Sequence, residues 1–326
     1  MFVDLHGPAL DAYRSAQTEP ADFDAFWAST IAESRAAADE TDAAELTVER
    51  IETPLHAFEV YDVTFPGFRG QPIRGWLRLP RHADGPLPVL VQYLGYGGGR
   101  ALPTENLIWA SGGFAHFVMD TRGQGSTWSV GDTPDPDGTD PQFPGVMTRG
   151  VRTRETYYYR RLITDAVRAI DAVRAIDLVD GSRVALYGRS QGGGLALAAG
   201  ALAPDVLGTI AQVPFLCDFP RAITITDAPP YSELVRYLSV HRREVERVHE
   251  TLRYVDGVNF ARRGRVPLWI SAALMDATCP PSTVVGAFHE WQGPKELTIW
   301  PYNGHEGGGA DGDVEVLEVA QGLLLG

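Results

Sequence analysis

The sequence contains little cysteine: only Cys217 and Cys279 occur among its 326 residues. Two cysteines cannot form the disulfide framework of a small secreted domain. We expect both to be buried free thiols, and a single bridge between them is the alternative. Hydrophobic residues make up 44% of the chain, enough for a core that needs no disulfide or metal to fold.

Basic residues are also scarce, with 28 Lys and Arg against 42 Asp and Glu, which gives a net charge of −14. Nucleic acids and anionic membrane surfaces would repel such a chain, so neither is an expected partner. No apolar run approaches the ~18 residues of a membrane span. Asp4 and Pro8 stand where a signal peptide has basic and then apolar residues. We therefore expect a cytoplasmic protein.

Signatures of metal and cofactor sites are missing as well. His305 and Glu306 are adjacent, a spacing that does not place both on one metal ion. The run GYGGG at 95–99 lacks the lysine of a phosphate-binding loop and the spacing of a dinucleotide fingerprint. We expect neither a metal nor a cofactor.

What the sequence does contain is a series of short apolar runs alternating with helical patterns. Continuous apolarity predicts strands buried on both faces of a mostly parallel sheet. The first two runs are joined by a segment with Pro66, Gly67 and Gly70, which favours an antiparallel pair. We expect one α/β domain over 1–326, with a twisted sheet of about eight strands and helices on both faces. The expected strands are 58–64, 73–79, 89–94, 114–119, 184–187, 209–213, 268–274 and 297–300.

Three segments do not follow this alternation of strands and helices. Residues 1–50 are expected to form an amino-terminal helical extension, with a helix at 21–37 and an exposed connection or frayed helix end at 36–49. Residues 218–260 are expected to form a helical insertion after the sixth strand, and an insertion at the carboxyl end of a sheet commonly covers a site. A loop at 123–150, rich in Pro, Gly and Asp, is long enough to be functional.

The strongest functional signal is GRSQG at 188–192, between the strand pattern RVALY and a helix of small residues. In this setting G-x-S-x-G predicts the nucleophile elbow of an α/β-hydrolase, with Ser190 as the nucleophile. Any side chain at Gly188 or Gly192 would crowd the neighbouring backbone. The alternative is an ordinary glycine-rich turn with an incidental serine.

A serine hydroxyl needs a base, and eight histidines are candidates. His305 lies in the glycine-rich loop PYNGHEGGG after the last expected strand, where the backbone can bring its imidazole over Ser190. Asp276 ends the strand pattern LWISAALMD between the two, which is the position of the orienting carboxylate. The alternatives are a solvated loop histidine and an aspartate that caps a helix starting at 280–282.

The oxyanion of an acyl-transfer reaction needs two backbone donors. One is expected from Gln191, which follows the nucleophile. The other comes from the loop after an earlier strand, VQYLGYGGG. Tyr93 is our choice there, with Leu94 or Tyr96 if the loop bends differently.

Over nearly its whole length the sequence resembles the acetylxylan esterase and cephalosporin C deacetylase family, the seventh of the carbohydrate esterase families. The combination of RGQ, G-x-S-Q-G and HE in this order is specific to that family. The motifs that carry the resemblance are VQYLGYGGG at 91, DTRGQGS at 120, GDTPDPDGTDPQFPGVMTRG at 131, TYYYRR at 156, GRSQGGG at 188, VPFLCDF at 213, YVDGVNFA at 254, MDATCPPSTV at 275 and PYNGHEGG at 301.

For the site, the resemblance implies the same triad and the amides of Tyr93 and Gln191 as oxyanion donors. It further implies that the RGQ residues support the site and that two residues of the insertion narrow the acyl pocket. The RGQ residues are Arg122, Gly123 and Gln124. The two residues of the insertion are Pro230 and Tyr231. Arg189 stands where relatives often carry glycine.

For function, the resemblance implies deacetylation of small substrates through an acetyl-serine intermediate. Acetylated xylo-oligosaccharides, cephalosporin C and simple acetate esters are the implied substrates. The implied assembly is a homohexamer, a trimer of dimers whose active sites face an internal cavity. Two other interpretations remain: another acyl hydrolase of this fold, a thioesterase or peptidase, or a non-catalytic ligand-binding scaffold. The scaffold would have a defective triad, whereas all three members are present here.

Overall fold

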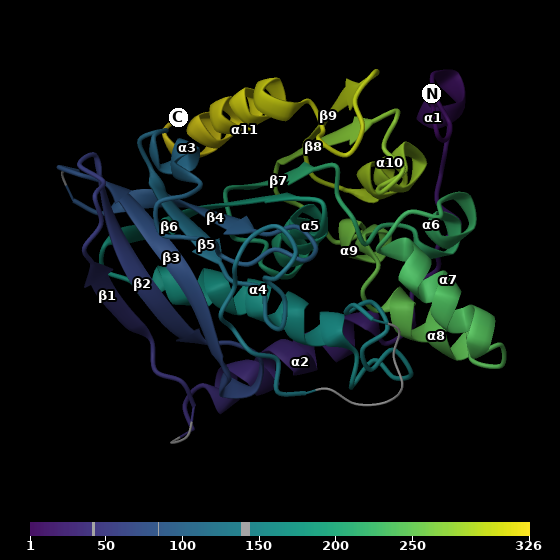
Figure 1. Cartoon of the computed structure of the whole chain (residues 1–326), viewed down its shortest axis with the longest axis horizontal. Helices are drawn as coiled ribbons and strands as arrows, with labels where there is room; N and C mark the ends of the chain where they lie inside the picture. Colours follow the sequence, from purple (N-terminus) through teal and green to yellow (C-terminus); the bar gives the residue numbers. More distant parts are fainter. Residues whose placement is uncertain (41–42, 84, 138–143) are drawn as a thin grey trace.

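The computed structural model of the chain describes residues 1–40, 43–83, 85–137 and 144–326. A nine-stranded sheet forms its centre, and helices cover both faces (Figure 1). The strands are β1 Thr47–Ile51, β2 Phe58–Pro66, β3 Pro72–Pro80, β4 Leu87–Tyr93, β5 Ala115–Met119, β6 Val179–Arg189, β7 Gly208–Gln212, β8 Leu268–Ala273 and β9 Lys295–Trp300.

The helices fall in the amino-terminal segment, in the crossovers between strands, in the insertion and at the carboxyl terminus. They are α1 Pro8–Asp11, α2 Phe23–Ala37, α3 Leu107–Ala110, α4 Tyr158–Arg174, α5 Gln191–Leu202, α6 Phe219–Ile225, α7 Tyr231–Val240, α8 Val245–Arg253, α9 Gly257–Ala261, α10 Pro281–Glu290 and α11 Gly309–Leu324, with a short 3-10 turn at Phe68–Gly70.

The strand order is β1-β2-β3-β5-β4-β6-β7-β8-β9. Pairing is antiparallel from β1 to β5 and parallel from β5 through β9, so the predicted parallel sheet with an antiparallel beginning is confirmed. All eight expected strands are present. β1 is an additional strand at the edge of the sheet. It begins within the segment 36–49, expected to be an exposed connection or a frayed helix end. Its sequence TVERI is only partly buried, so no apolar run marks it.

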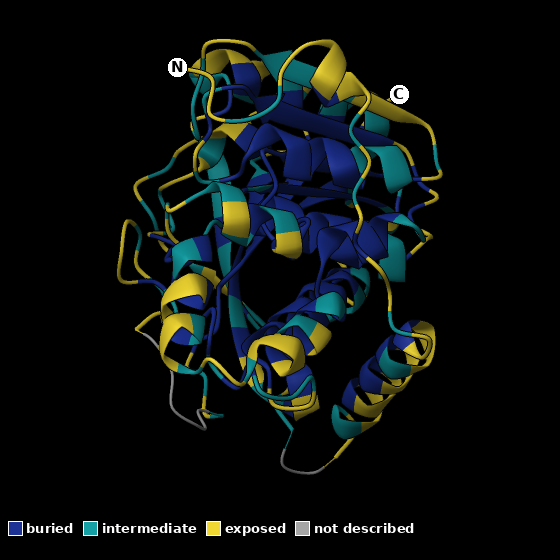
Figure 2. Cartoon of the chain, turned by 90° about the vertical axis from the view of Figure 1, so that its right-hand side faces the viewer, coloured by how far each residue is buried: buried dark blue, intermediate teal, exposed yellow. Residues whose placement is uncertain are grey.

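The central strands are buried on both faces, as their continuous apolarity predicts. Val89 and Val91 of β4 belong to the larger core, which lies against α4 and α5. Leu90 between them belongs to a second core on the other face, formed with α3 and α11. Figure 2 shows the strands and the inner sides of these helices as one buried interior with exposed residues outside.

The predicted insertion is present as four helices, α6 to α9, after the strand that ends at Gln212. With β1 counted, that strand is the seventh rather than the sixth. Helices α6, α7 and α8 lie together at the edge of the molecule, beyond the carboxyl ends of the parallel strands (Figure 1). In the amino-terminal segment α2 packs on α4, and α1 packs on α10.

Three sequence predictions concern smaller features. Cys217 and Cys279 are both buried and unbridged, as expected. Within the described ranges, no helix has the length and apolarity to cross a bilayer. The long loop at 123–150 is described on both sides, but its residues 138–143 lie outside the described part of the chain.

Candidate active site

Ser190 occupies the turn between β6 and α5, with φ 58° and ψ −122°. This conformation is strained for a residue with a side chain and persists only where the surrounding structure enforces it. A Cβ at Gly188 would lie 2.1 Å from the backbone of Gly192, and a Cβ at Gly192 would lie 2.1 Å from the carbonyl oxygen of Tyr93. The two glycines therefore allow β4, β6 and α5 to meet at Ser190.

Ser190, His305 and Asp276 form a continuous hydrogen-bonded chain. Nε2 of His305 lies 2.9 Å from Oγ of Ser190, and Nδ1 lies 2.8 Å from Oδ2 of Asp276. Asp276 is fully buried, whereas 35% of the His305 side chain is exposed. When Nδ1 donates to the carboxylate, Nε2 is left as an acceptor for the serine hydroxyl. That tautomer is the one a general base requires.

The second oxygen of Asp276 is also occupied. Oδ1 accepts from the backbone N–H groups of Thr278 and Cys279, at 2.8 Å each. These bonds fix the carboxylate so that Oδ2 faces His305. Helix α10 begins only at Pro281, with Pro280 as its N-cap residue. Asp276 thus orders the turn before the helix and does not cap it, so the alternative interpretation is wrong.

A second histidine, His116, is fully buried but is not hydrogen-bonded to Ser190, His305 or Asp276. It is in β5, where Nε2 lies 2.9 Å from Oε1 of Gln92. Burial, together with the nearby guanidinium of Arg78, lowers its pKa well below the ordinary value. His116 is therefore a neutral histidine of the sheet interior, as its place in an apolar run suggests.

The two residues predicted as oxyanion donors adjoin Ser190. Tyr93 ends β4 and pairs with Gly188 of β6, and Gln191 is the first residue of α5. The side chain of Gln191 donates to the carbonyl oxygen of Leu94 at 3.2 Å. This bond ties the loop after β4 to the start of α5. The structure therefore brings both predicted donor segments to the nucleophile.

Gln124 links the same two segments through its side-chain amide. Its Oε1 accepts from the backbone N–H of Gly97 at 2.6 Å, and its Nε2 donates to Oε1 of Gln191 at 3.0 Å. The hydroxyl of Tyr158 accepts a further bond from Nε2 at 2.8 Å, and that of Tyr159 donates to Gln191 at 3.0 Å. The sequence marked these tyrosines only as part of a motif, TYYYRR, without a role.

Arg122 and Gly123 precede Gln124 in the same loop and contact residues on the side away from the serine. Arg122 is fully buried, and its Nη2 donates to Oδ1 of Asp165 at 2.7 Å. Gly123 has φ +64°, and a Cβ there would lie 2.8 Å from the side chain of Asp135. Both residues anchor the loop that carries Gln124.

A cavity of about 740 Å³ opens beside Ser190 and His305. Pro230 of the insertion lines it, as the family resemblance implies. Tyr231 does not: it is fully buried, its ring packs 4.4 Å from that of Phe215, and its hydroxyl bonds to the backbone of Cys217. The other lining residues are Gln92, Tyr93, Leu94, Gly95, Tyr96, Asn106, Ile108, Trp109, Thr127, Trp128, Tyr187, Arg189, Pro229, Thr278, Glu306 and Asp313.

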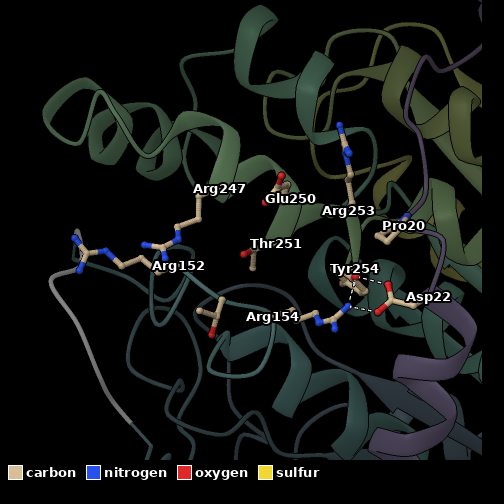
Figure 3. Close-up of a pocket in the computed structure, with 10 residues that line it drawn as sticks. Pro20, Asp22, Arg152, Arg154, Arg247, Glu250, Thr251, Arg253 and Tyr254 are labelled. Carbon is tan, nitrogen blue, oxygen red and sulfur yellow. Dashed lines mark hydrogen bonds and ion pairs between the residues drawn. The ribbon is translucent and has the colours of Figure 1, made fainter.

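Another cavity, of about 410 Å³, lies between α8, the residues before α2 and the loop before α4 (Figure 3). Its walls carry Arg152, Arg154, Arg247 and Arg253, with Asp22 and Glu250 among them. Arg154 is already bonded to Asp22, as Figure 3 shows. Its hydroxyl groups belong to Thr153, Thr251 and Tyr254, and no histidine is among the residues that line it. The cavity at Ser190 has a hydroxyl group and a histidine base already in contact, which makes it the candidate active site.

Among the described residues, Asp276, Cys279 and His305 have ligand-type atoms within 4.8 Å of one another, close enough to be considered for a metal ion. Asp276 and His305 are, however, hydrogen-bonded to each other and to Ser190. Burial raises the pKa of the Cys279 thiol well above its ordinary value, which disfavours the thiolate that a metal needs. The cluster fits a triad with a neighbouring thiol better than a metal site.

The fold and the site together define a class of protein. A Ser–His–Asp chain at the carboxyl edge of a mainly parallel sheet, with the serine on a strand–turn–helix, is the arrangement of the α/β-hydrolases. A family model for acetyl xylan esterase matches residues 1–323. The chain therefore belongs to the acetyl xylan esterase family, as its sequence predicts.

Individual relatives agree with this assignment. The chain is 31% identical to the acetyl esterase Axe7A of Xylanibacter ruminicola over 298 residues, which cover 88% of this chain but only 63% of that longer protein. The structure is similar to an acetyl xylan esterase from Paenibacillus sp. R4, with a TM-score of 0.87, 37% identity and 97% and 99% of the two chains covered. Acetyl xylan esterase 1 from Thermoanaerobacterium sp. matches with a TM-score of 0.87, 30% identity and coverage of 98% and 99%.

Proposed function

We propose that this protein is a serine esterase that removes acetyl groups from small acetylated substrates. The observation that carries the proposal is the chain from Asp276 through His305 to Ser190, with contacts of 2.8 and 2.9 Å. The names of the relatives, which are acetyl esterases and acetyl xylan esterases, support acetate as the acyl group.

In the acylation step, Oγ of Ser190 bonds to the acetyl carbonyl carbon while Nε2 of His305 takes the hydroxyl proton. Asp276 stabilises the resulting imidazolium and does not itself take the proton. The backbone N–H groups of Tyr93 and Gln191 hold the negative charge that develops on the carbonyl oxygen. The bond to the leaving alcohol then breaks, and His305 returns the proton to that alcohol.

In the deacylation step, water takes the place of the alcohol. His305 removes a proton from the water as its oxygen bonds to the acetyl carbon of the acetyl-serine. The bond to Oγ then breaks, acetate leaves, and Ser190 regains its proton from His305. Gln124 serves both steps, because it holds the loop after β4 and the start of α5 at a fixed separation.

We infer that the alcohol portion is small or oligomeric, such as an acetylated xylo-oligosaccharide, cephalosporin C or a simple acetate ester. The cavity of about 740 Å³ supports this, because it extends well beyond the serine to Trp109, Asn106 and Trp128. The rim residue Pro230 is proposed to limit the acyl side.

An acyl-length series on the purified protein tests the proposal. We expect 4-nitrophenyl acetate to be hydrolysed with a higher kcat/KM than the butyrate and octanoate esters, with Ser190→Ala as the background control. Faster turnover of a thioester or an aminoacyl anilide than of acetate would instead favour the thioesterase or peptidase alternative. Release of acetate from cephalosporin C and from acetylated xylo-oligosaccharides then ranks the alcohols.

The family resemblance also leads us to propose a hexamer with its active sites facing an internal cavity, and a cytoplasmic location. Light scattering that gives six times the chain mass would support the assembly. Such an assembly would admit acetylated oligosaccharides and exclude intact acetylated polymer, and the ratio of these two rates is a second measurement. Cell fractionation tests the location.

A further inference from the structure

Gln212, the last residue of β7, contacts both the segment of the serine and the segment of the histidine. Its backbone oxygen accepts from the N–H of Ser190 at 2.9 Å. Its side-chain Nε2 donates to the carbonyl oxygen of Gly307 at 3.1 Å, and Gly307 lies two residues after His305. Gln212 is fully buried. One residue therefore joins the nucleophile turn, through its backbone, to the loop that carries the base, through its side chain.

The direction of the Gln212 amide is set by Arg189. Nε of Arg189 donates to Oε1 of Gln212 at 2.8 Å, and the hydroxyl of Tyr187 approaches the same oxygen at 3.2 Å. An amide has one acceptor end and one donor end. With a cationic donor at the oxygen, the NH₂ group must face Gly307. Arg189 is held in turn by Asp313 of α11, whose Oδ1 accepts from Nη2 at 2.6 Å.

The His305 loop needs hydrogen bonds to other segments to hold its conformation, because its own glycine-rich backbone can adopt many. It contains Gly304, Gly307, Gly308 and Gly309, and the last three have positive φ. The start of the loop is tied to the turn after β8 by the N–H of Met275, which donates to the carbonyl oxygen of Asn303 at 3.0 Å. Beyond His305, the Gln212–Gly307 bond ties the loop to β7.

Helix α11 encloses this bond. A Cβ at Gly312 would lie 2.5 Å from the carbonyl oxygen of Gly307 and 2.7 Å from Nε2 of Gln212. The first turn of the helix therefore packs directly on the donor and the acceptor. Gly307 is buried, so breaking the bond would leave a buried carbonyl without the donor that it has here.

We propose that Arg189 is a positioning residue, which orients Gln212 and thereby holds His305 at hydrogen-bond distance from Ser190. The inference rests on the proposed function, because this position matters for turnover only if His305 is the base. The proposal also gives a role to Arg189 at the first variable position of the G-x-S-x-G motif. Without Arg189, only the longer bond from the hydroxyl of Tyr187 remains at the amide oxygen of Gln212. The amide can then turn, the Gly307 carbonyl loses its donor, and the loop moves.

Two substitutions test the two halves of this linkage. Arg189→Met keeps the aliphatic stem and removes the donor. Gln212→Glu keeps an acceptor for Arg189 but places an oxygen against the carbonyl of Gly307. A misplaced base slows the chemical step, so we expect kcat on 4-nitrophenyl acetate to fall about tenfold to 100-fold in each variant. KM should change by less than about twofold in Gln212→Glu, because Gln212 does not line the substrate cavity. Arg189 does line that cavity, so for Arg189→Met only kcat is compared.

The linkage also predicts how the substitutions combine. Arg189→Met added to Gln212→Leu should cost little beyond Gln212→Leu alone, because both act through one hydrogen bond. The matched control is Arg174→Met at the far end of α4, which removes the ion pair to Asp205 and whose arginine side chain is 27% exposed, against 34% for Arg189. It should leave kcat unchanged, and a general loss of stability in the other variants would appear as a lower Tm.

A readout that needs no substrate separates this inference from the proposed function. We expect the proton between Nδ1 of His305 and Asp276 to give a low-field NMR resonance that is sharp in the wild-type protein and shifted or broadened in Arg189→Met. An unchanged resonance, or kcat within about twofold of wild type, overturns the inference. If Gln212→Glu does not fold, Arg189→Met and Arg189→Gly still decide, since the Arg189 side chain is 34% exposed.

Discussion

Nε2 of His305 lies 2.9 Å from Oγ of Ser190, although 115 residues separate them in the sequence. The contact follows from the topology: β6, β7, β8 and β9 are consecutive parallel strands, so their carboxyl ends meet at one edge of the sheet. Ser190 follows β6 and His305 follows β9 at that edge. The base and the nucleophile are thus brought together by the sheet rather than by a local motif.

Replacing the nucleophile should abolish turnover. We expect Ser190→Ala to reduce kcat on 4-nitrophenyl acetate on the order of 10⁶-fold, because the methyl group cannot form the acyl-enzyme. The matched control is Ser182→Ala, an exposed serine at the start of β6 whose hydroxyl bonds only locally to Asp180. A fluorophosphonate probe should label the wild type and the control but not Ser190→Ala. Labelling at another serine would contradict the assignment.

The glycine after the nucleophile is required by a close approach of backbone. In Gly192→Ala the new Cβ would lie 2.1 Å from the carbonyl oxygen of Tyr93, so β4 and α5 must separate. Because Tyr93 and Gln191 are the proposed oxyanion donors, a shift near 1 Å should lower kcat about 100-fold. The control is Gly322→Ala in α11, where a Cβ meets nothing within 4 Å. It should raise stability by roughly 0.5–1 kcal/mol through helix propensity, measured as an increase in Tm.

The sequence predicts this site well because local chemistry demands particular residues at Gly188, Ser190 and Gly192. Asp276 and His305 are predictable for a second reason, since each follows a strongly apolar strand and their order along the chain is fixed by the fold. Composition and strand pattern likewise predict the sheet, because its central strands are buried on both faces.

Other features depend on tertiary contacts that the sequence does not reveal. β1 is an edge strand with charged residues, so it lacks an apolar signature. Tyr231 and Pro230 are neighbours, yet only Pro230 faces the cavity, because the start of α7 turns the tyrosine into the core. The role of Gln212 depends on Arg189 and Gly307, which reach it from distant parts of the chain.

Gln124 should matter for rate rather than for substrate binding. In Gln124→Glu one oxygen still accepts from Gly97, but the donor to Gln191 is lost and two oxygens face each other. An unfavourable contact between partly buried polar groups costs about 1–3 kcal/mol, which corresponds to a fall in kcat of roughly fivefold to 150-fold if it is felt in the transition state. Steady-state kinetics on acetate esters measure it. A change confined to KM would contradict the positioning of the oxyanion loop by Gln124.

Glu233 of α7 predicts a pH dependence of stability. Glu233 is buried, with 7% of the residue exposed, and both of its carboxylate oxygens lie within hydrogen-bond distance of the hydroxyl of Tyr96, at 2.8 and 2.9 Å. Burial raises the pKa of Glu233 above its ordinary value, although the bonds from Tyr96 and from the N–H of Met147 oppose the shift. The folded state therefore holds the proton more tightly than the unfolded chain does.

The sign of the effect follows from this difference in proton affinity. The contribution of Glu233 to stability is fully present below the unfolded pKa of about 4.3 and is lost as pH rises through the raised folded pKa. Glu233→Gln removes this contribution. The Tm of the wild type minus that of the variant should therefore decrease as the pH is raised from about 4.3 through the folded pKa, and level off above it. Glu246→Gln on α8, at an exposed position, provides the matched control for the loss of one carboxyl group. A difference for Glu233→Gln that grows with pH would mean that the hydrogen bonds, and not burial, determine the charge of this carboxyl group.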